Sequence, residues 1–64
     1  MPFVQVSLAT GRTPEQIRAL ISEVTAAVAR AVDAPAANVR VVVTEVPPTH
    51  WAAGDVTIQE RNRA

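Results

Sequence analysis

The first two residues are the first place in this chain where chemistry is conceivable, because a proline follows the initiator methionine. If Met1 is removed, Pro2 begins the mature chain with a secondary amine on a rigid ring. The pKa of an α-amino group is about 7.7 to 8.0, and burial and nearby cations both disfavour its charged form. In an apolar pocket near arginines, this amine could be neutral at pH 7 and act as a general base.

Two arginines could supply the positive charge that the reaction of such a base requires. Removal of a proton next to a carbonyl builds negative charge on oxygen, and a guanidinium can stabilise that charge while it also holds a carboxylate. Arg12 follows Gly11 in a predicted turn, and Arg40 interrupts the apolar run of residues 39–46. From the residues alone, Arg40 lies either on a solvated face or in a functional cavity, and Trp51 is either a packing residue or a pocket wall.

The usual motifs of metal, nucleotide and nucleophilic chemistry are missing from the sequence. It contains no cysteine, a single histidine (His50), no glycine-rich phosphate loop and no Walker motif. A lone histidine in a loop is more often a surface residue than a general base. We therefore expect neither a metal nor a cofactor.

Charge and composition limit the possible partners. Six basic residues, all arginines, balance six acidic residues, whereas nucleic-acid and membrane-surface binding usually need a clustered basic face. An arginine-only basic set fits bidentate carboxylate binding, although GC-rich codon usage gives the same composition. Without a membrane span or a signal-like segment, we expect a cytoplasmic protein that binds a small-molecule carboxylate, and neither nucleic acid nor a membrane.

The first elements that position these residues are predicted to be a strand and a helix. Residues 3–8 alternate apolar and polar side chains, which is typical of a strand. Residues 13–16, Thr-Pro-Glu-Gln, form a capping box with proline at the first helical position, so a helix begins there. Its apolar stripe comprises Ile17, Leu20, Ile21, Val24, Val28, Ala31 and Val32. Pro35 ends the helix, because the residue before a proline disfavours the α conformation.

Residues 39–46 are rich in β-branched side chains and predict a second strand, parallel to the first. The tail then predicts a small hairpin with a Gly-Asp turn and a short strand at 56–58. The 64 residues thus form one α/β domain, a single β-α-β unit with a C-terminal hairpin. One helix covers one sheet face only, so we expect other subunits to cover the rest and to share in any active site.

Several of these features, in this order and in a chain of this size, resemble the 4-oxalocrotonate tautomerases of the tautomerase superfamily. The features are Pro2, Gly11-Arg12, the helix end at Asp33, Val39-Arg40-Val41 and His50-Trp51. The resemblance covers essentially the whole chain. Each feature is weak alone, but their joint spacing is specific.

The resemblance implies a β-α-β protomer in a hexamer, a trimer of dimers, with Pro2 as the general base that moves a proton between carbons of a 2-hydroxydienoate or related enol. It also implies that Arg12 binds and polarises the distal carboxylate. Arg40, reaching in from a neighbouring subunit, would bind the 2-oxo or 2-hydroxy group and a carboxylate oxygen. Trp51 stands where the family usually has phenylalanine, in the apolar wall that helps lower the pKa of Pro2.

The chain departs from the family in its tail, where residues 52–55 replace a glycine-rich hairpin and residues 61–63 (Arg-Asn-Arg) an arginine-rich end. Related dehalogenases on this scaffold use a carboxylate near position 53 and an arginine near position 9. Because Ala53 and Ala9 stand here, hydrolytic dehalogenation is disfavoured, with Asp55 the nearest carboxylate. The same amine could instead support hydration, decarboxylation or carbon–carbon bond formation. The chain could also be a non-catalytic subunit, either in a mixed hexamer or because it keeps Met1.

Overall fold

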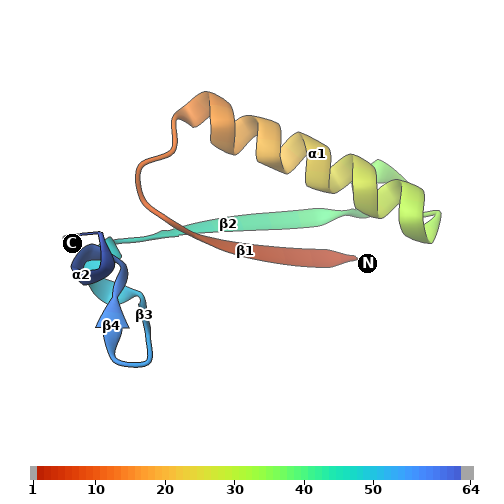
Figure 1. The fold of residues 1–64 in the computed structure, drawn as a ribbon. Coiled ribbons are helices and arrows are strands. Elements are labelled where there is room, and N and C mark those ends of the chain that lie inside the picture. The colour runs from red at the N-terminus through yellow and green to blue at the C-terminus, as the bar shows by residue number, and fades with distance from the viewer. Residues whose placement is uncertain (1, 63–64) are drawn as a thin grey trace.

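A computed structural model describes residues 2–62 as a strand–helix–strand unit followed by a small C-terminal hairpin (Figure 1). The elements are β1 Phe3–Ala9, α1 Pro14–Val32, a 3₁₀ helix Ala36–Asn38, β2 Arg40–Val46, a second 3₁₀ helix Pro48–His50, β3 Ala52–Ala53, β4 Val56–Thr57 and α2 Ile58–Arg61. The predicted β-α-β order is confirmed. Within the described range, neither helix is long and apolar enough to cross a membrane.

The two long strands lie side by side and parallel, as the crossover through α1 predicts. Their register runs from Phe3 opposite Arg40 to Ala9 opposite Val46. Because side chains alternate between the faces of a strand, one face of this pair packs beneath α1 and the other stays open. Figure 1 shows α1 crossing over one side of the strands only.

Helix α1 starts and ends where the local sequence signals predict. The Thr13 hydroxyl accepts the Gln16 amide at 3.1 Å, and the Gln16 side chain accepts the Thr13 amide at 3.0 Å. This reciprocal pair satisfies two amides that the helix itself leaves without acceptors. At the other end Asp33 takes the left-handed conformation, with φ 55°, and its amide donates to the Ala29 carbonyl.

The last turn of α1 departs from the predicted stripe. Ala31 is exposed, and Val32 is 60% exposed rather than packed on the sheet. In Figure 1 this turn extends past the start of β1, so no strand lies beneath it. The strand predicted from residue 39 begins instead at Arg40, because the Val39 amide still donates to the Ala36 carbonyl at 3.1 Å.

The structure of the C-terminal tail differs from the predicted strand at residues 56–58. A hairpin forms around Gly54 and Asp55, but its second strand ends at Thr57 and a one-turn helix follows in place of the predicted strand residue Ile58. The cause is a second capping box: the Thr57 hydroxyl accepts the Glu60 amide, and the Glu60 carboxylate accepts the Thr57 amide. The helix begins where that box supplies acceptors for its first amides.

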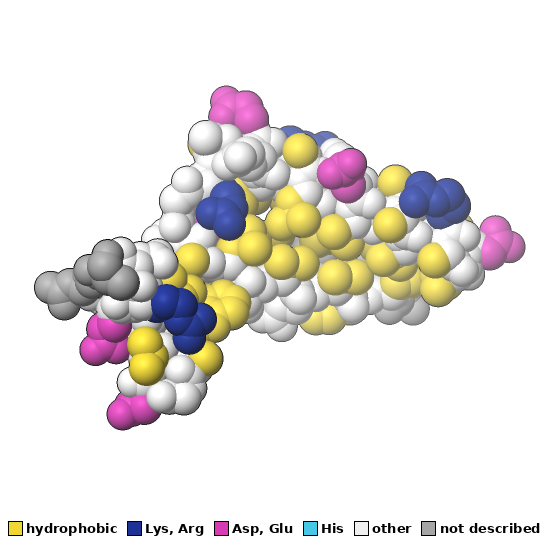
Figure 2. Space-filling model, in the orientation of Figure 1, with side chains coloured by type: hydrophobic (Ala, Val, Ile, Leu, Met, Phe, Trp, Pro, Cys, Tyr) yellow, Lys and Arg dark blue, Asp and Glu magenta, His cyan; other side chains and the backbone are white. Residues whose placement is uncertain are grey.

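A single protomer has almost no closed core. Val39 is the one buried hydrophobic residue among residues 2–62, while Phe3 on the open face of the sheet is 61% exposed. Figure 2 shows hydrophobic side chains in a continuous band between α1 and the sheet, still reachable from solvent. The radius of gyration is 14.8 Å, against about 11 Å for a compact domain of this length. The protomer is flat and leaves much apolar surface uncovered.

Candidate functional site

Two of the predicted site residues, Pro2 and Arg40, meet at one end of the sheet. Pro2 is half-buried and immediately precedes β1, and its carbonyl accepts the Arg40 amide at 2.9 Å. Arg40 opens β2 directly opposite Phe3. The two strand starts therefore bring the backbones of Pro2 and Arg40 side by side, although the two residues are far apart in the sequence.

The Arg40 side chain is exposed and belongs to the open face of the sheet, with Val42 two residues further along. Its Nη1 donates to the Ala37 carbonyl at 3.0 Å, which turns the guanidinium back over the preceding 3₁₀ helix. A guanidinium carries several N–H donors in a fixed fork, so this bond occupies part of its capacity only. In the protomer, Arg40 lies on an accessible face and has donors to spare for a carboxylate.

The other two predicted residues lie at the opposite end of the sheet. Arg12 follows the C-terminal end of β1, and Trp51 follows the 3₁₀ helix that succeeds β2. Seven residues of β1, at about 3.3 Å each, separate Pro2 from the Arg12 loop by about 23 Å. Figure 1 shows the N-terminus and the C-terminal hairpin at opposite ends of the strands. One protomer does not bring all four residues together.

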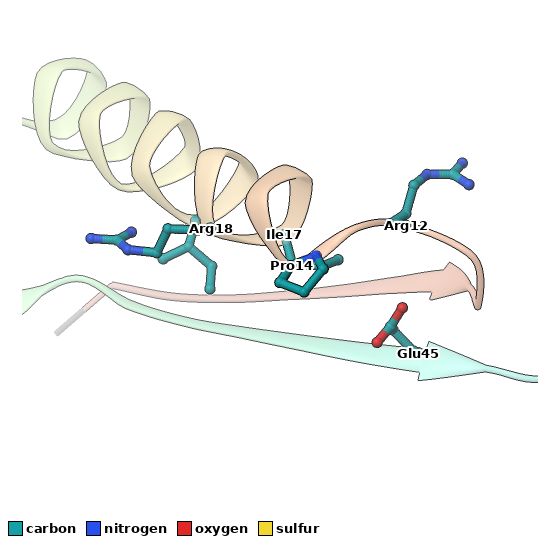
Figure 3. Close-up of a pocket in the computed structure, with 6 residues that line it drawn as sticks. Arg12, Pro14, Ile17, Arg18 and Glu45 are labelled. Atoms are coloured by element: carbon teal, nitrogen blue, oxygen red, sulfur yellow. The ribbon is translucent and has the colours of Figure 1, made fainter.

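A pocket of about 370 Å³ opens beside Arg12, between the start of α1 and the end of β2 (Figure 3). Its lining residues are Arg12, Pro14, Ile17, Arg18, Ile21 and Glu45. In Figure 3 the Glu45 carboxylate rises from β2 toward the pocket, whereas the Arg12 guanidinium points away from it. A smaller pocket of about 200 Å³ also includes Arg12, so this residue lines both pockets.

Arg18 and Glu45 are charged residues near Arg12 that the sequence patterns do not single out as site residues. Glu45 continues the alternation of Val41 and Val43, which places it on the face toward α1. That alternation is visible in the sequence, whereas the approach of Arg18 depends on how α1 crosses the sheet. The Arg18 Nη1 donates to the Ser22 hydroxyl at 2.9 Å, one turn further along the helix.

The C-terminal hairpin holds Trp51 through its backbone. The Trp51 carbonyl accepts the amide of Ile58, the first residue of α2, at 2.9 Å, and the Trp51 side chain is 37% exposed. Beside it, hydrogen bonds from the Thr57 backbone and then its side chain lower the pKa of the Glu60 carboxyl below its ordinary value of 4.5. His50 is exposed.

The alternative carboxylate, Asp55, occupies the hairpin turn with φ 66°, next to Gly54 and two residues after Ala53. Arg61 is the last residue of α2. Met1 and Arg63 lie outside the described residues, so the predicted removal of Met1 and the role of Arg63 are not addressed by the structure.

Comparison with known proteins identifies the same family along nearly the whole chain. The family described as "Tautomerase enzyme" matches residues 2–61. The chain is 44% identical over 63 residues to a 2-hydroxymuconate tautomerase of Comamonas testosteroni, covering 98% of this chain and 100% of that protein. These matches confirm the resemblance that the sequence features indicate.

Solved structures of related proteins share the fold of this chain as well as part of its sequence. TomN, a 4-oxalocrotonate tautomerase homologue in the tomaymycin biosynthetic pathway, superposes with a TM-score of 0.96 at 36% identity, over 98% of this chain and 97% of that one. A heterohexamer 4-oxalocrotonate tautomerase from Chloroflexus aurantiacus J-10-fl gives a TM-score of 0.90 at 40% identity, over 94% and 97%. With sequence and fold in agreement over this span, the chain belongs to the tautomerase family of enzymes.

Proposed function

We propose that this enzyme catalyses cofactor-free enol–keto tautomerisation of a small 2-hydroxy or 2-oxo carboxylic acid, with 2-hydroxymuconate as the first substrate to test. The observation that carries the proposal is the match of residues 2–61 to the tautomerase family, with Pro2, Arg12 and Arg40 at the positions that the resemblance assigns to the base and the two arginines. The 44% identity to a 2-hydroxymuconate tautomerase supports the choice of substrate.

In the proposed mechanism, removal of Met1 turns the Pro2 nitrogen from an amide into a basic secondary amine. The neutral amine takes the proton of the 2-hydroxyl group, and its conjugate acid then gives a proton to a carbon of the conjugated chain, so that an O–H bond is exchanged for a C–H bond with no net change in protons. Arg40, reaching in from a neighbouring subunit, holds the 2-hydroxy or 2-oxo oxygen and a carboxylate oxygen, where negative charge develops. Arg12 binds the distal carboxylate, and Trp51 forms an apolar wall that favours the neutral amine.

The site is proposed to form between protomers of a hexamer, a trimer of dimers. Support comes from the separation of about 23 Å between Pro2 and the Arg12 loop, which is too long for one small carboxylate to span. The open sheet face around Phe3 gives a second reason, since exposed apolar surface of this kind favours association. A related protein is described as a heterohexamer, so a mixed hexamer is a second candidate assembly.

The direct test is ketonisation of 2-hydroxymuconate and phenylenolpyruvate by protein whose N-terminus is verified by mass to be Pro2. We expect Pro2→Ala to lower kcat/KM, because it replaces the rigid secondary amine with a primary amine that the chain holds less firmly. His50→Ala is the comparison variant, because His50 is the alternative general base, and we expect it to keep most of its activity. Full activity of Pro2→Ala would show that catalysis does not depend on the secondary amine of Pro2.

The same preparation separates two competing functions from tautomerisation. A non-catalytic subunit of a mixed hexamer would lack activity alone and gain it only with a second chain, and the heterohexameric relative is the observation that favours this test. Chemistry through an iminium on Pro2 would be revealed by borohydride trapping with an aldehyde. Hydrolytic dehalogenation remains disfavoured by Ala9 and Ala53.

A further inference from the structure

We propose that Thr57 and Glu60 are positioning residues that hold Trp51 in place and so tune substrate binding without touching the substrate. The inference rests on the proposed role of Trp51 as a wall of the site. Its structural part, the hold on Trp51, stands independently of that role and can be measured independently.

Thr57 and Glu60 bind each other reciprocally at the start of α2. The Glu60 Oε1 accepts the Thr57 amide at 2.8 Å, and the Thr57 Oγ1 accepts the Glu60 amide at 3.1 Å. Helix α2 has four residues, far fewer than an isolated helix needs to be stable in water. A single turn of this kind depends on its cap and on its packing, so loss of the box should unwind it.

The box is joined to Trp51 by the backbone. Thr57 pairs with Ala52 in the β3–β4 ladder, and the next residue, Ile58, donates its amide to the Trp51 carbonyl at 2.9 Å. The segment Trp51–Ala52 is therefore held by the segment that the box keeps in place. Each hairpin strand has only two residues, and a hairpin of that size is weak alone.

The charge of Glu60 strengthens this arrangement. Its hydrogen bonds from Thr57 lower the pKa of the carboxyl, which means that they favour the ionised form. A bond from an amide to a carboxylate is shorter and stronger than a neutral one. An exchange of Glu60 for glutamine keeps an acceptor but loses the charge, so it should weaken the cap without abolishing it.

Trp51 provides its own probe, because it is the sole tryptophan in the chain. We would compare Thr57→Val and Glu60→Ala with the conservative variants Thr57→Ser and Glu60→Gln, using intrinsic fluorescence, acrylamide quenching and near-ultraviolet circular dichroism. Gln59→Ala is the matched control, since Gln59 is an exposed polar residue in the same turn. Far-ultraviolet circular dichroism and native mass spectrometry verify that each variant folds and assembles.

We expect Thr57→Val and Glu60→Ala to shift Trp51 emission to the red, to increase its quenching, and to raise KM for 2-hydroxymuconate about threefold to tenfold. The pH profile of kcat/KM should also move to higher pH, because a displaced Trp51 favours the neutral Pro2 amine less. Thr57→Ser and Glu60→Gln should restore most of the wild-type signal, and Gln59→Ala should match the wild type. Wild-type emission and quenching in both Thr57→Val and Glu60→Ala would overturn the proposal, as would a changed emission with unchanged KM.

Different results would contradict the proposed tautomerase activity and the proposed positioning of Trp51. If the wild-type protein had no tautomerase activity, the proposed function would be wrong, while Trp51 emission would still decide whether the pair holds this residue. If the wild type were active but the variants left both emission and KM unchanged, only the positioning role would be lost.

Discussion

The separation of the two sheet ends predicts that two inactive variants restore one another's activity when mixed. Pro2 precedes β1 and Arg12 follows it, and the seven residues of the strand separate them by about 23 Å. Pro2→Ala replaces the rigid secondary amine of the proposed base with a flexible primary amine, and Arg12→Ala removes a carboxylate anchor, so we expect each variant alone to lose most of its kcat/KM. Because each site would take Pro2 from one protomer and Arg12 from another, a mixed assembly contains some intact sites.

The magnitude follows from random assembly. In an equal mixture, half of the protomers carry an intact Pro2 and half carry an intact Arg12. A site that draws the two residues from different protomers receives both intact in about one quarter of cases. If a single protomer supplied both residues, no site in the mixture would be intact, since every chain carries one of the two substitutions. The expected recovery is therefore about 25% of the wild-type rate for a shared site, and no recovery is expected for a site within one protomer.

The assay is refolding of the two variants together from denaturant at equal concentration, followed by ketonisation of 2-hydroxymuconate. Native mass spectrometry establishes that mixed assemblies are present, and each variant refolded alone sets the background. A rate no higher than this background, in a sample shown to contain mixed assemblies, would refute a site shared between protomers.

Three further predictions address the charge, the open face and the tail. Arg40→Ala should raise KM at least about tenfold, and Arg40→Lys should recover only part of the loss because an ammonium lacks the bidentate fork; steady-state kinetics check this. Val42→Asp, on the open sheet face, should shift the assembly toward smaller species in native mass spectrometry, with Gln5→Asp on the neighbouring strand as a more tolerant comparison. Glu60 has a lowered pKa when folded, so its contribution to stability is complete above the unfolded value, near 4.5, and disappears as pH falls through the lower folded value. Urea unfolding should therefore show a steeper loss of stability below about pH 4.5 for the wild type than for Glu60→Gln, and parallel curves would contradict the role of this carboxylate.

Local signals in the sequence predict most of the fold. The capping box at Thr13 and the break before Pro35 set the two ends of α1, because they act within a few residues of where they occur. The tail is predicted less well, since three alternating residues at 56–58 cannot distinguish a strand from the start of a helix. The Thr-x-x-Glu spacing of Thr57 and Glu60 is the signal that identifies α2.

The site can be predicted by residue type but not by arrangement. Family resemblance and chemistry single out Pro2, Arg12, Arg40 and Trp51, yet which of them are neighbours depends on the parallel register of β1 and β2. The approach of Glu45 and Arg18 to a common pocket likewise depends on where α1 crosses the sheet. Such contacts between distant segments leave no local signal in the sequence.

The most direct test of Pro2 as the general base is to compare the activity of the chain that begins at Pro2 with that of the same chain retaining Met1, each verified by intact mass. With Met1 attached, the Pro2 nitrogen is a tertiary amide without basicity. We therefore predict ketonisation of 2-hydroxymuconate by the shorter chain and a rate at least about 100-fold lower for the longer one. Equal activity of the two forms would contradict Pro2 as the general base.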